Sequence, residues 1–579
     1  MDSDDYLDAA AAAVWIGSAR NERSFLLGKH WTNKMKDGFI RVAAATPRIH
    51  VADCAYNVGE AIRIAKKAEC DSVRVLVFPE LCLTAYTCSD LFFMKTLTDS
   101  ALDALRRYLR ETAELDMLSM IGIPVVHRDK LYNCAAICLR GKLLGLVPKS
   151  CIPNYSEFYE ARHFAPAPSQ NDILHFDGYD VPFGSKLLFA CDTMPSLRIA
   201  AEICEDLWVP VPPSSTHALA GATLLCNLSA SNETIGKDDY RRLLVTSHSA
   251  RMLAGYVYAS SGDGESTNDI VFSGHDLIAE NGTVLAEKKP FAEEEYIISE
   301  IDTERLVRER SRINTFSARL PEGYVEIHFS LTPQETPLSR WVDPHPFVPA
   351  DSRERTRRCE TILSIQAHGL AQRIERAYAR KCVIGISGGL DSCLAMLVTA
   401  RAMDLLGRPR TDVIGVTMPC FGTTKRTKSN AVVLCEEMGV TFREVDIADA
   451  VQVHFRDIGH SPEVHNVVYE NVQARERTQV LMDVANAEGG IVVGTGDLSE
   501  LALGWATYNG DHMSMYGVNA SVPKTLVRHI VAFYADREED KGNARLAQAL
   551  RDILDTPFST ELLPADENGS ISQKTEDLV

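Results

Sequence analysis

The sequence predicts an α/β protein in which a mixed α/β domain is followed by a domain with a doubly wound parallel sheet. At 579 residues the chain is several times the usual length of one domain, so we expect at least two domains. Both halves alternate short β-rich runs with stretches of helical periodicity. Between them, residues 319–355 are rich in proline and lack periodicity, which is typical of a linker. We therefore predict an N-terminal arm at 1–36, a first domain at 37–310, a linker at 311–354 and a second domain at 355–579.

The composition argues against several classes of protein. A formal net charge of −19 disfavours nucleic-acid and membrane-surface binders, because these need basic patches. The 15 cysteines lack the spacing of a disulfide framework or a zinc site, so we expect reduced thiols and a cytoplasmic location. Acidic residues precede the alanine-rich N-terminal run, unlike a signal peptide, and no stretch reaches the roughly 18 apolar residues of a membrane helix. We expect no nucleic-acid or membrane partner.

The first domain is predicted from short β-rich runs that alternate with helical stretches. The strands are expected at 39–44, 73–78, 120–126, 135–139, 143–148, 197–203, 223–228 and 256–260, and the helices at 57–68 and 99–112. Three of the strands are followed by a reactive side chain. Glu80 follows V-F-P, Lys149 follows V-P, and Cys204 follows A-A-E-I.

These three residue types together can hydrolyse an amide. A cysteine attacks a carbonyl only as a thiolate, so it needs a base and a positive charge nearby. Glu80 is the candidate base, and Lys149 is the candidate cation for the thiolate and the developing oxyanion. Taken singly, each residue has an alternative interpretation, in which Cys204 fills the core and Glu80 and Lys149 are surface charges.

The second domain begins with a long helix and then alternates strands with helices. Helices are expected at 355–379, 393–406, 428–438 and 471–487, and strands at 382–386, 413–418, 441–446 and 491–494. Strands separated by helices indicate a parallel, doubly wound sheet.

The stretch S-G-G-L-D-S at 387–392 lies where the first of these strands gives way to a helix. Ligands bind at this edge of a parallel sheet, and the N-terminus of a helix favours an anion. The two glycines allow a close approach of the backbone, and Asp391 can hold a metal ion that bridges phosphates. The stretch matches neither the Walker loop nor G-x-G-x-x-G. The alternative is a tight turn in which Asp391 only caps the helix.

This turn resembles the pyrophosphate loop of the N-type ATP pyrophosphatases. G-T-G-D-L-S-E at 494–500, E-N-V-Q-A-R at 470–475 and Trp505 narrow the resemblance to the NAD synthetases. The resemblance implies that ATP contacts Gly385, Ser387, Gly388, Gly389, Leu390, Asp391, Ser392 and Thr495. It implies that deamido-NAD contacts Asn471, Arg475, Glu500 and Trp505, and that Asp391 and Glu500 bind Mg²⁺. Arg475 and Arg477 have the alternative of a solvated helix face.

The first domain resembles the nitrilase and amidase superfamily, because V-F-P-E-L, V-P-K and I-C-E-D occur in the order of that family. The resemblance implies a four-layer αββα sandwich with Glu80, Lys149 and Cys204 as catalytic residues. It places the second glutamate of the family at Glu157, where this side chain would orient the substrate amide and the lysine. It also implies a glutamine pocket lined by Tyr86, Tyr155, Ser231 and Lys237. Lys237 stands where the family often has arginine, which puts the affinity for glutamine in question.

Both halves together resemble the glutamine-dependent NAD synthetases of the actinobacterial type, from about Lys36 to Leu562. The resemblance implies an ATP-dependent carbon–nitrogen ligase. Glutamine would form a thioester at Cys204 and release ammonia. Mg²⁺ and ATP would serve to adenylate deamido-NAD, and the ammonia would displace AMP to give NAD, with pyrophosphate and glutamate as the other products. The family implies an internal route for ammonia and a homo-oligomer, commonly an octamer.

The C-terminus departs from the family pattern. The family continues after Leu562 with a helical segment that carries a lysine, and here the chain becomes polar and ends at Val579. We favour a truncated form with weak or lost synthetase activity over a lineage that completes its site with Lys524 or Arg528. Three alternative functions remain possible from the sequence. They are a stand-alone carbon–nitrogen hydrolase (a glutaminase) with an inactive or regulatory nucleotide-binding domain, a different amidotransferase such as a GMP or asparagine synthetase, and a non-enzymatic binding protein.

Overall fold

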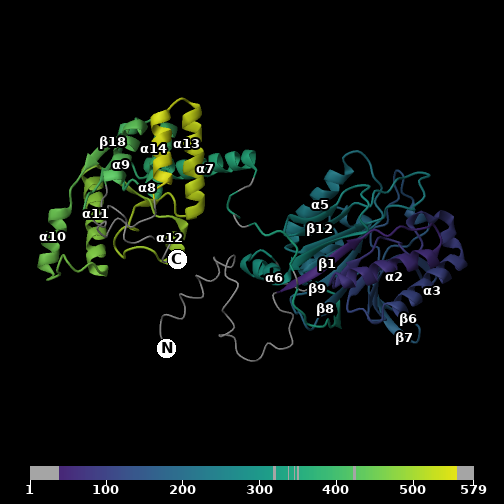
Figure 1. Cartoon of the computed structure of the whole chain (residues 1–579). Helices are drawn as coiled ribbons and strands as arrows, with labels where there is room; N and C mark the ends of the chain where they lie inside the picture. The colour runs from purple at the N-terminus through teal and green to yellow at the C-terminus, as the bar shows by residue number, and fades with distance from the viewer. Residues whose placement is uncertain are drawn as a thin grey trace. The chain divides into compact units, whose positions relative to one another are not determined.

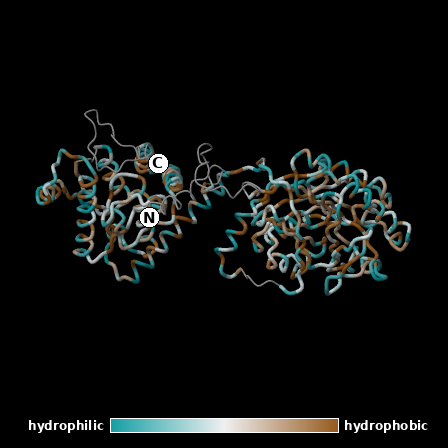
Figure 2. Tube along the Cα trace, turned by 90° about the horizontal axis from the view of Figure 1, so that it is seen from below, coloured by the Kyte–Doolittle hydropathy of each residue, from teal (hydrophilic) through white to brown (hydrophobic). Residues whose placement is uncertain are grey.

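The computed structural model describes residues 38–316, 321–336, 338–343, 346–348, 351–421 and 425–556. These residues form two compact units, one ending at Val342 and one beginning at Asp343 (Figure 1). The predicted arm at 1–36 and the predicted C-terminal truncation lie outside the described residues. In each unit, Figure 2 shows brown, hydrophobic segments in the interior and teal, hydrophilic segments along the periphery. None of the described helices is long and apolar enough to cross a membrane.

The first unit contains two sheets. The eight described strands of one sheet are, in spatial order, β14 (Tyr296–Asp302), β1 (Phe39–Ala45), β2 (Val75–Val77), β3 (Leu118–His127), β4 (Lys130–Leu139), β5 (Lys142–Pro148), β7 (Tyr179–Phe183) and β6 (Asp172–Phe176). The seven of the other are β13 (Thr283–Lys288), β12 (Asp276–Glu280), β11 (Gly255–Ser260), β10 (Leu224–Ser229), β9 (Arg198–Ile203), β8 (Leu187–Cys191) and β15 (Val325–Phe329). The eight strands predicted from sequence correspond to β1–β5 and β9–β11.

The two sheets pack face to face and have helices on their outer faces. One hydrophobic core contains residues of both sheets, such as Val42 of β1 and Ile199 of β9. A second core joins the outer face of the first sheet to α2 (Cys54–Cys70) and α3 (Lys95–Glu111). A third joins the outer face of the second sheet to α5 (Lys237–Met252), and α4 (Pro213–Leu219) contacts β9. The unit is therefore the four-layer αββα sandwich implied by the nitrilase resemblance.

The segment predicted as a linker, 311–354, is partly structured. It begins with the end of helix α6 (Thr303–Arg312) and includes β15, which pairs in parallel with β8 and forms the edge of the second sheet. Further along, Glu300 of β14 accepts hydrogen bonds from the backbone N–H groups of Ser339 (3.1 Å) and Arg340 (2.9 Å). The proline-rich composition concealed this edge strand, because β15 is short and three of its five residues are exposed.

The second unit has a five-stranded parallel sheet within the described residues. Its strands are, in spatial order, β18 (Thr441–Glu444), β17 (Val413–Thr417), β16 (Cys382–Gly385), β19 (Ile491–Gly494) and β20 (Tyr516–Gly517). The core on one face includes residues of α7 (Ser352–Arg376), α8 (Leu390–Leu405), α9 (Lys425–Met438), α13 (Lys524–Asp540) and α14 (Ala544–Leu554). The core on the other face includes residues of α10 (Ala448–Asp457) and α11 (Val467–Glu488). Cys382 and Val383 belong to opposite cores, so β16 is covered on both faces, as in a doubly wound sheet.

Candidate active sites

The first site lies where strands of the two sheets end next to one another. Glu80 follows β2 by three residues, Lys149 directly follows β5, and Cys204 directly follows β9 and begins the 3₁₀ helix η3 (Cys204–Leu207). All three side chains are buried. The backbone N–H of Glu80 donates to the carbonyl of Ser229 at the end of β10 (3.3 Å), which ties the first sheet to the second beside the site.

Lys149 is held between two carboxylates. Its Nζ lies 2.7 Å from Oε1 of Glu80 and 2.7 and 2.9 Å from the two carboxylate oxygens of Glu160. Glu80 also accepts hydrogen bonds from Nδ2 of Asn133 (2.6 Å) and from the backbone N–H of Ala230 (2.9 Å). Burial lowers the pKa of Lys149, but the charges of Glu160 and Glu80 outweigh burial and raise it well above its usual value. The lysine therefore stays cationic although its side chain is buried.

Cys204 has a strained backbone conformation, and its thiol is protonated, so the thiol must lose its proton before the sulfur can act as a nucleophile. Its φ of +43° lies in the left-handed region, and its N–H donates to Oδ1 of Asn227 (3.1 Å), which fixes the turn. Burial and the charge of Glu80 raise the pKa of the Cys204 thiol to about 12, and Lys149 acts in the opposite direction. The thiol is therefore protonated near neutral pH. It needs a base to react, and Glu80 is the carboxylate whose charge acts on it most strongly.

Asp206 connects the segments that carry Cys204 and Lys149. Its buried carboxylate accepts hydrogen bonds from the backbone N–H groups of Ile203 (3.0 Å), Ser150 (3.2 Å) and Cys151 (2.7 Å). One carboxylate thus fixes the residue before the nucleophile to the two residues after the lysine. Asp206 is the last residue of the I-C-E-D motif that was recognised in the sequence.

The prediction that Glu157 contacts the lysine is wrong in position. The carboxylate against Lys149 is that of Glu160, the first residue of the 3₁₀ helix η2 (Glu160–Arg162). Glu157 instead accepts a hydrogen bond from Nδ2 of Asn232 (2.7 Å). The stretch Y-S-E-F-Y-E offers two glutamates, and a turn at Ser156 (φ +50°) decides that the second one is buried. Sequence alone does not distinguish them, since both flank aromatic residues.

The residues predicted to bind glutamine lie around this network. Tyr86 donates through its hydroxyl to Glu160 (2.8 Å), and Tyr155 donates to Glu205, the neighbour of Cys204 (2.9 Å). Tyr86 is packed into the site, whereas 54% of Tyr155 is exposed, which leaves it on the solvent side.

The other two predicted glutamine ligands, Ser231 and Lys237, follow β10. Lys237 donates to Oδ1 of Asn232 and lies 5.2 Å from the ring centroid of Trp208. Burial lowers the pKa of Lys237, and the negative charges of Glu157 and Glu233 oppose this shift. Ser231 accepts a long hydrogen bond of 3.3 Å from Arg241, a fully buried arginine that sequence analysis missed because it lies in an ordinary-looking helix.

The second site lies at the carboxyl edge of the parallel sheet, between β16 and β19. These strands are neighbours in the sheet, so the turns that follow them share one edge. The S-G-G-L-D-S turn connects β16 to α8, with Gly388 at φ +85° and the N–H of Gly389 donating to the hydroxyl of Ser387 (3.2 Å). Ser392 returns a hydrogen bond to the carbonyl of Gly389 (3.0 Å). The backbone at Gly388 has the left-handed conformation that glycine adopts without strain.

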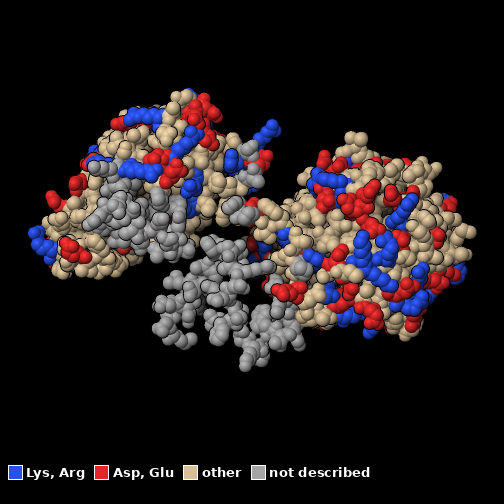
Figure 3. Space-filling model, in the orientation of Figure 1, with Lys and Arg blue, Asp and Glu red and all other residues tan. Residues whose placement is uncertain are grey.

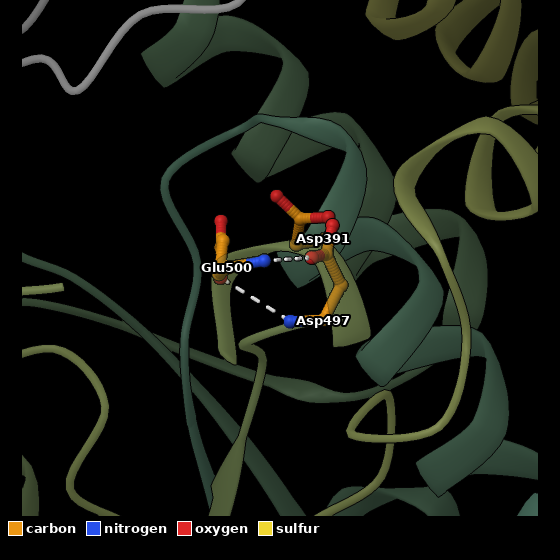
Figure 4. A group of neighbouring side chains, drawn as sticks. All are labelled: Asp391, Asp497 and Glu500. Atoms are coloured by element: carbon orange, nitrogen blue, oxygen red, sulfur yellow. Dashed lines mark hydrogen bonds between the residues drawn. The ribbon is translucent and has the colours of Figure 1, made fainter. Parts of the chain in front are cut away.

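Three carboxylates meet at this edge (Figure 4). Asp391 comes from the first turn of α8, and Asp497 and Glu500 come from the N-terminus of α12 (Leu498–Leu503). Asp497 and Glu500 form a capping box, in which each side chain accepts from the backbone N–H of the other. One carboxylate oxygen from each of the three residues lies within 4.8 Å of the others. Asp497 was not among the predicted metal ligands, although it stands in the quoted G-T-G-D-L-S-E stretch.

Lys524, the first residue of α13, lies within this group of carboxylates. Its Nζ is 2.6 Å from Oδ2 of Asp391, 2.8 Å from Oδ2 of Asp497 and 3.0 Å from Oε1 of Glu500. Burial raises the pKa of Glu500 to about 7, and the charge of Lys524 opposes that shift. Among the described residues, three carboxylates therefore face the ammonium of Lys524, and the group retains a surplus of negative charge when all are ionised.

The residues of this group fit a magnesium ion. Mg²⁺ prefers carboxylate oxygens. Oδ1 of Asp391 is buried and has no hydrogen-bond partner in the described part of the chain, so a strong acceptor faces the site unsatisfied.

Asn519 joins the two turns that carry the carboxylates. Its Nδ2 donates to the backbone carbonyls of both Asp391 and Thr495, each at 3.0 Å. Its Oδ1 accepts from Nε2 of Gln366 of α7 (3.1 Å), which fixes the orientation of the amide. Sequence analysis missed both residues, since a buried Asn and a helical Gln carry no motif.

The residues predicted to bind deamido-NAD lie close to one another. Asn471 and Arg475 are one turn apart on α11, and they contact Thr507 (2.9 Å) and the carbonyl of Tyr508 (3.1 Å), in the loop that follows Trp505. The N–H of Trp505 donates to the carbonyl of Glu500 (2.9 Å), so this loop begins beside the carboxylate group.

Comparison with known proteins matches both units to described families. The carbon-nitrogen hydrolase family matches residues 41–310, and the NAD synthase family matches residues 362–536. The chain is 44% identical over 544 residues to the glutamine-dependent NAD(+) synthetase of Mycobacterium tuberculosis (strain ATCC 25618 / H37Rv), covering 92% of this chain and 80% of that one. It is 44% identical over 558 residues to that of Mycobacterium leprae (strain TN), covering 94% and 82%. The same enzyme of Thermotoga maritima is 28% identical over 503 residues, covering 86% and 81%.

Proposed function

Because the chain belongs to the family of glutamine-dependent NAD(+) synthetases, we propose that it converts deamido-NAD to NAD⁺ with glutamine as the nitrogen donor and ATP as the energy source. The observation that carries the proposal is the presence, in one chain, of a buried Glu–Lys–Cys constellation and of a carboxylate-lined site beside a glycine-rich turn. The rival of a hydrolase with an inactive nucleotide-binding domain gains no support, because the NAD synthase family matches residues 362–536. The mycobacterial relatives confirm the predicted actinobacterial type.

In the first half-reaction, Glu80 takes the proton of the Cys204 thiol as the sulfur attacks the side-chain amide of glutamine. Lys149, which stays cationic between Glu80 and Glu160, stabilises the oxyanion of the tetrahedral intermediate. Ammonia leaves with the proton that Glu80 returns, and a thioester remains at Cys204. Water then attacks the thioester, with Glu80 again as the base, and glutamate is released.

In the second half-reaction, the nicotinate carboxylate of deamido-NAD attacks the α-phosphorus of ATP, and pyrophosphate leaves. The turn at Ser387–Ser392 offers backbone N–H groups and hydroxyls to the phosphates. Ammonia then attacks the acyl adenylate and displaces AMP. Asp391, Asp497 and Glu500 would hold Mg²⁺, which when bound supplies positive charge to the phosphate oxygens.

The roles of the substrate-binding residues follow from the resemblance and the contacts together. We assign glutamine recognition to Tyr86, Tyr155, Ser231 and Lys237. We assign deamido-NAD recognition to Asn471, Arg475, Glu500 and Trp505. The role first given to Glu157 passes to Glu160, and Glu157 orients Asn232 and through it Lys237.

The cellular setting belongs to the same proposal. Cysteines throughout the described residues are free thiols, which fits the reducing cytoplasm. Basic and acidic groups are interspersed on the face in Figure 3, which fits small-molecule substrates rather than nucleic acid. A homo-oligomer, an octamer by resemblance, is part of the proposal, and light scattering coupled to size-exclusion chromatography measures it.

The proposed function is tested by NAD⁺ formation from deamido-NAD and Mg²⁺–ATP, with glutamine and ammonium supplied in separate reactions. We expect NAD⁺ from both nitrogen sources, with AMP and pyrophosphate in equal amounts. Glutamate release without NAD⁺ from either source would contradict the proposal and support a glutaminase. Hydrolysis of ATP to ADP and phosphate would contradict the adenylate step.

A further inference from the structure

We propose that Lys524 is a built-in competitor of the divalent metal ion, so that the metal binds only when the Lys524 ammonium leaves the three carboxylates. The inference rests on the proposed function for the identity of the metal site, but it concerns a property of the chain without ATP or deamido-NAD. It assigns Lys524 the role of a positioning residue that acts through the carboxylate group.

The first step of the argument is geometric. The Nζ of Lys524 lies at hydrogen-bond distance from one oxygen of each carboxylate, between 2.6 and 3.0 Å. A metal ion bound by Asp391, Asp497 and Glu500 would need oxygens of the same three side chains, which lie within 4.8 Å of one another. Two cations cannot share that position, because their mutual repulsion at such distances is large. Metal and ammonium therefore exclude each other.

The second step concerns charge. The three carboxyl groups outnumber the one ammonium that Lys524 places among them. A lysine is flexible along its four-carbon stem, so its ammonium can leave without moving the helix. The stem starts from a fixed point, because the backbone N–H of Lys524 donates to the hydroxyl of Ser499 (3.1 Å). A divalent metal ion carries twice the charge of the Lys524 ammonium. Its stronger attraction to the three carboxylates favours replacement of the ammonium by the metal.

The third step concerns the resting protein. Without a cation, three carboxylates whose oxygens lie within 4.8 Å of one another would repel one another. The Lys524 ammonium, which lies 2.6 to 3.0 Å from one oxygen of each carboxylate, keeps the group compact until the metal arrives. The α12 capping box, which joins Asp497 to Glu500, is thereby preserved in the metal-free chain.

The test is the binding of Mn²⁺ alone to the full chain, measured from the electron paramagnetic resonance signal of free Mn²⁺. Lys524→Met keeps the length of the side chain and removes its charge. We expect it to tighten Mn²⁺ binding by at least about tenfold, because a unit charge at contact distance from the ligands is removed. Lys541→Met is the matched control at the C-cap of the same helix, since Lys541 pairs only with Glu538 among the described contacts (2.7 Å). It should leave Mn²⁺ affinity unchanged.

A double variant locates the effect. Adding Asp391→Asn to Lys524→Met should abolish the gain in affinity, because it removes a carboxylate of the group. Equal Mn²⁺ affinity in Lys524→Met and the unaltered chain, or no Mn²⁺ binding in either, would overturn the proposal. So would a gain that survives Asp391→Asn, because that gain would come from another site.

A second measurement uses the unaltered chain and needs no variant to fold. Reductive methylation of Lys524, followed by peptide mass spectrometry, reports the accessibility of its amine, and we expect Mg²⁺ alone to accelerate it at least about threefold as the ammonium enters solvent. Methylation of Lys541 in the same digest should not change. Unchanged or slower methylation of Lys524 at saturating Mg²⁺ would overturn the proposal. A chain that makes no NAD⁺ but shows the accelerated methylation would contradict the proposed function and leave this inference standing.

Discussion

The ammonium of Lys149 lies 2.7 Å from a carboxylate oxygen of Glu160, and both side chains are buried. We predict that Glu160→Gln lowers kcat for glutamine-dependent NAD⁺ synthesis by about 100-fold or more, because Lys149 loses one of its two charged partners. Glu157→Gln is the matched control. Its amide oxygen still accepts from Asn232, so its kcat should change by less than about threefold. Ammonium-driven synthesis should be unchanged in both variants, and equal losses of glutamine-driven kcat in the two would contradict the assignment of Glu160.

The reactivity of Cys204 should depend on pH in a defined direction. Its thiol has a pKa of about 12, so the thiolate fraction is small near neutrality and rises about tenfold per pH unit. We predict that alkylation of Cys204 by iodoacetamide, without glutamine, accelerates continuously between about pH 7 and pH 9. Lys149→Met removes a charge that lowers this pKa, so it should slow the reaction at each pH. A plateau within that range would show that the thiolate already predominates, contrary to the buried environment.

Removal of the nucleophile should separate the two half-reactions. Cys204→Ala is expected to abolish NAD⁺ synthesis from glutamine and to leave synthesis from ammonium within about twofold, because only glutamine hydrolysis needs the thiolate. NAD⁺ production is measured with each nitrogen source. Loss of both activities would indicate a structural role for Cys204.

Asp391→Asn should impair NAD⁺ synthesis and spare glutamine hydrolysis. Replacing one carboxylate of the metal group is expected to lower NAD⁺ synthesis by about 100-fold or more with either nitrogen source, while glutamine hydrolysis without ATP persists. Asp404→Asn is the control on the same helix, since Asp404 pairs with Arg410 away from the sheet edge (2.6 Å). Normal ammonium-driven rates in Asp391→Asn would exclude Asp391 as a metal ligand.

Asn519 should control the geometry of the ATP site without touching a substrate. Asn519→Leu removes the donor to the carbonyls of Asp391 and Thr495 at similar volume, and we predict a loss of up to about 100-fold in kcat for NAD⁺ synthesis with ammonium. The affinity of the Asn519→Leu variant for Mn²⁺ should fall as well. A general loss of stability would reduce the amount of folded protein, but it would not weaken Mn²⁺ binding by the molecules that remain folded. Gln366→Leu, which removes the donor to Oδ1 of Asn519 and to the carbonyl of Val518 (2.9 Å), should give a smaller loss. Unchanged kcat and Mn²⁺ affinity in Asn519→Leu would refute the positioning role.

Much of the fold could be predicted because its signals are local. Buried parallel strands such as β16 and β17 are continuous apolar runs, and the helices between them have regular periodicity. β12 and β15 escaped prediction for different reasons. β12 is a run of only three apolar residues between Asp276 and Glu280, and β15 lies in a proline-rich segment and forms the edge of its sheet. Pairing across a long sequence separation leaves no trace in local composition.

The sequence by itself determined the chemistry of the two sites. The glycine-rich turn after a strand, and a glutamate, a lysine and a cysteine each after a strand, depend on residue type and local order, which are written in the chain. Only the tertiary structure decided which of two nearby glutamates meets Lys149, that Lys524 lies among three carboxylates, and that Asn519 joins two turns. Those relationships depend on the direction of side chains from segments that are distant in sequence. Packing of strands and helices against one another sets that direction, and no local pattern records it.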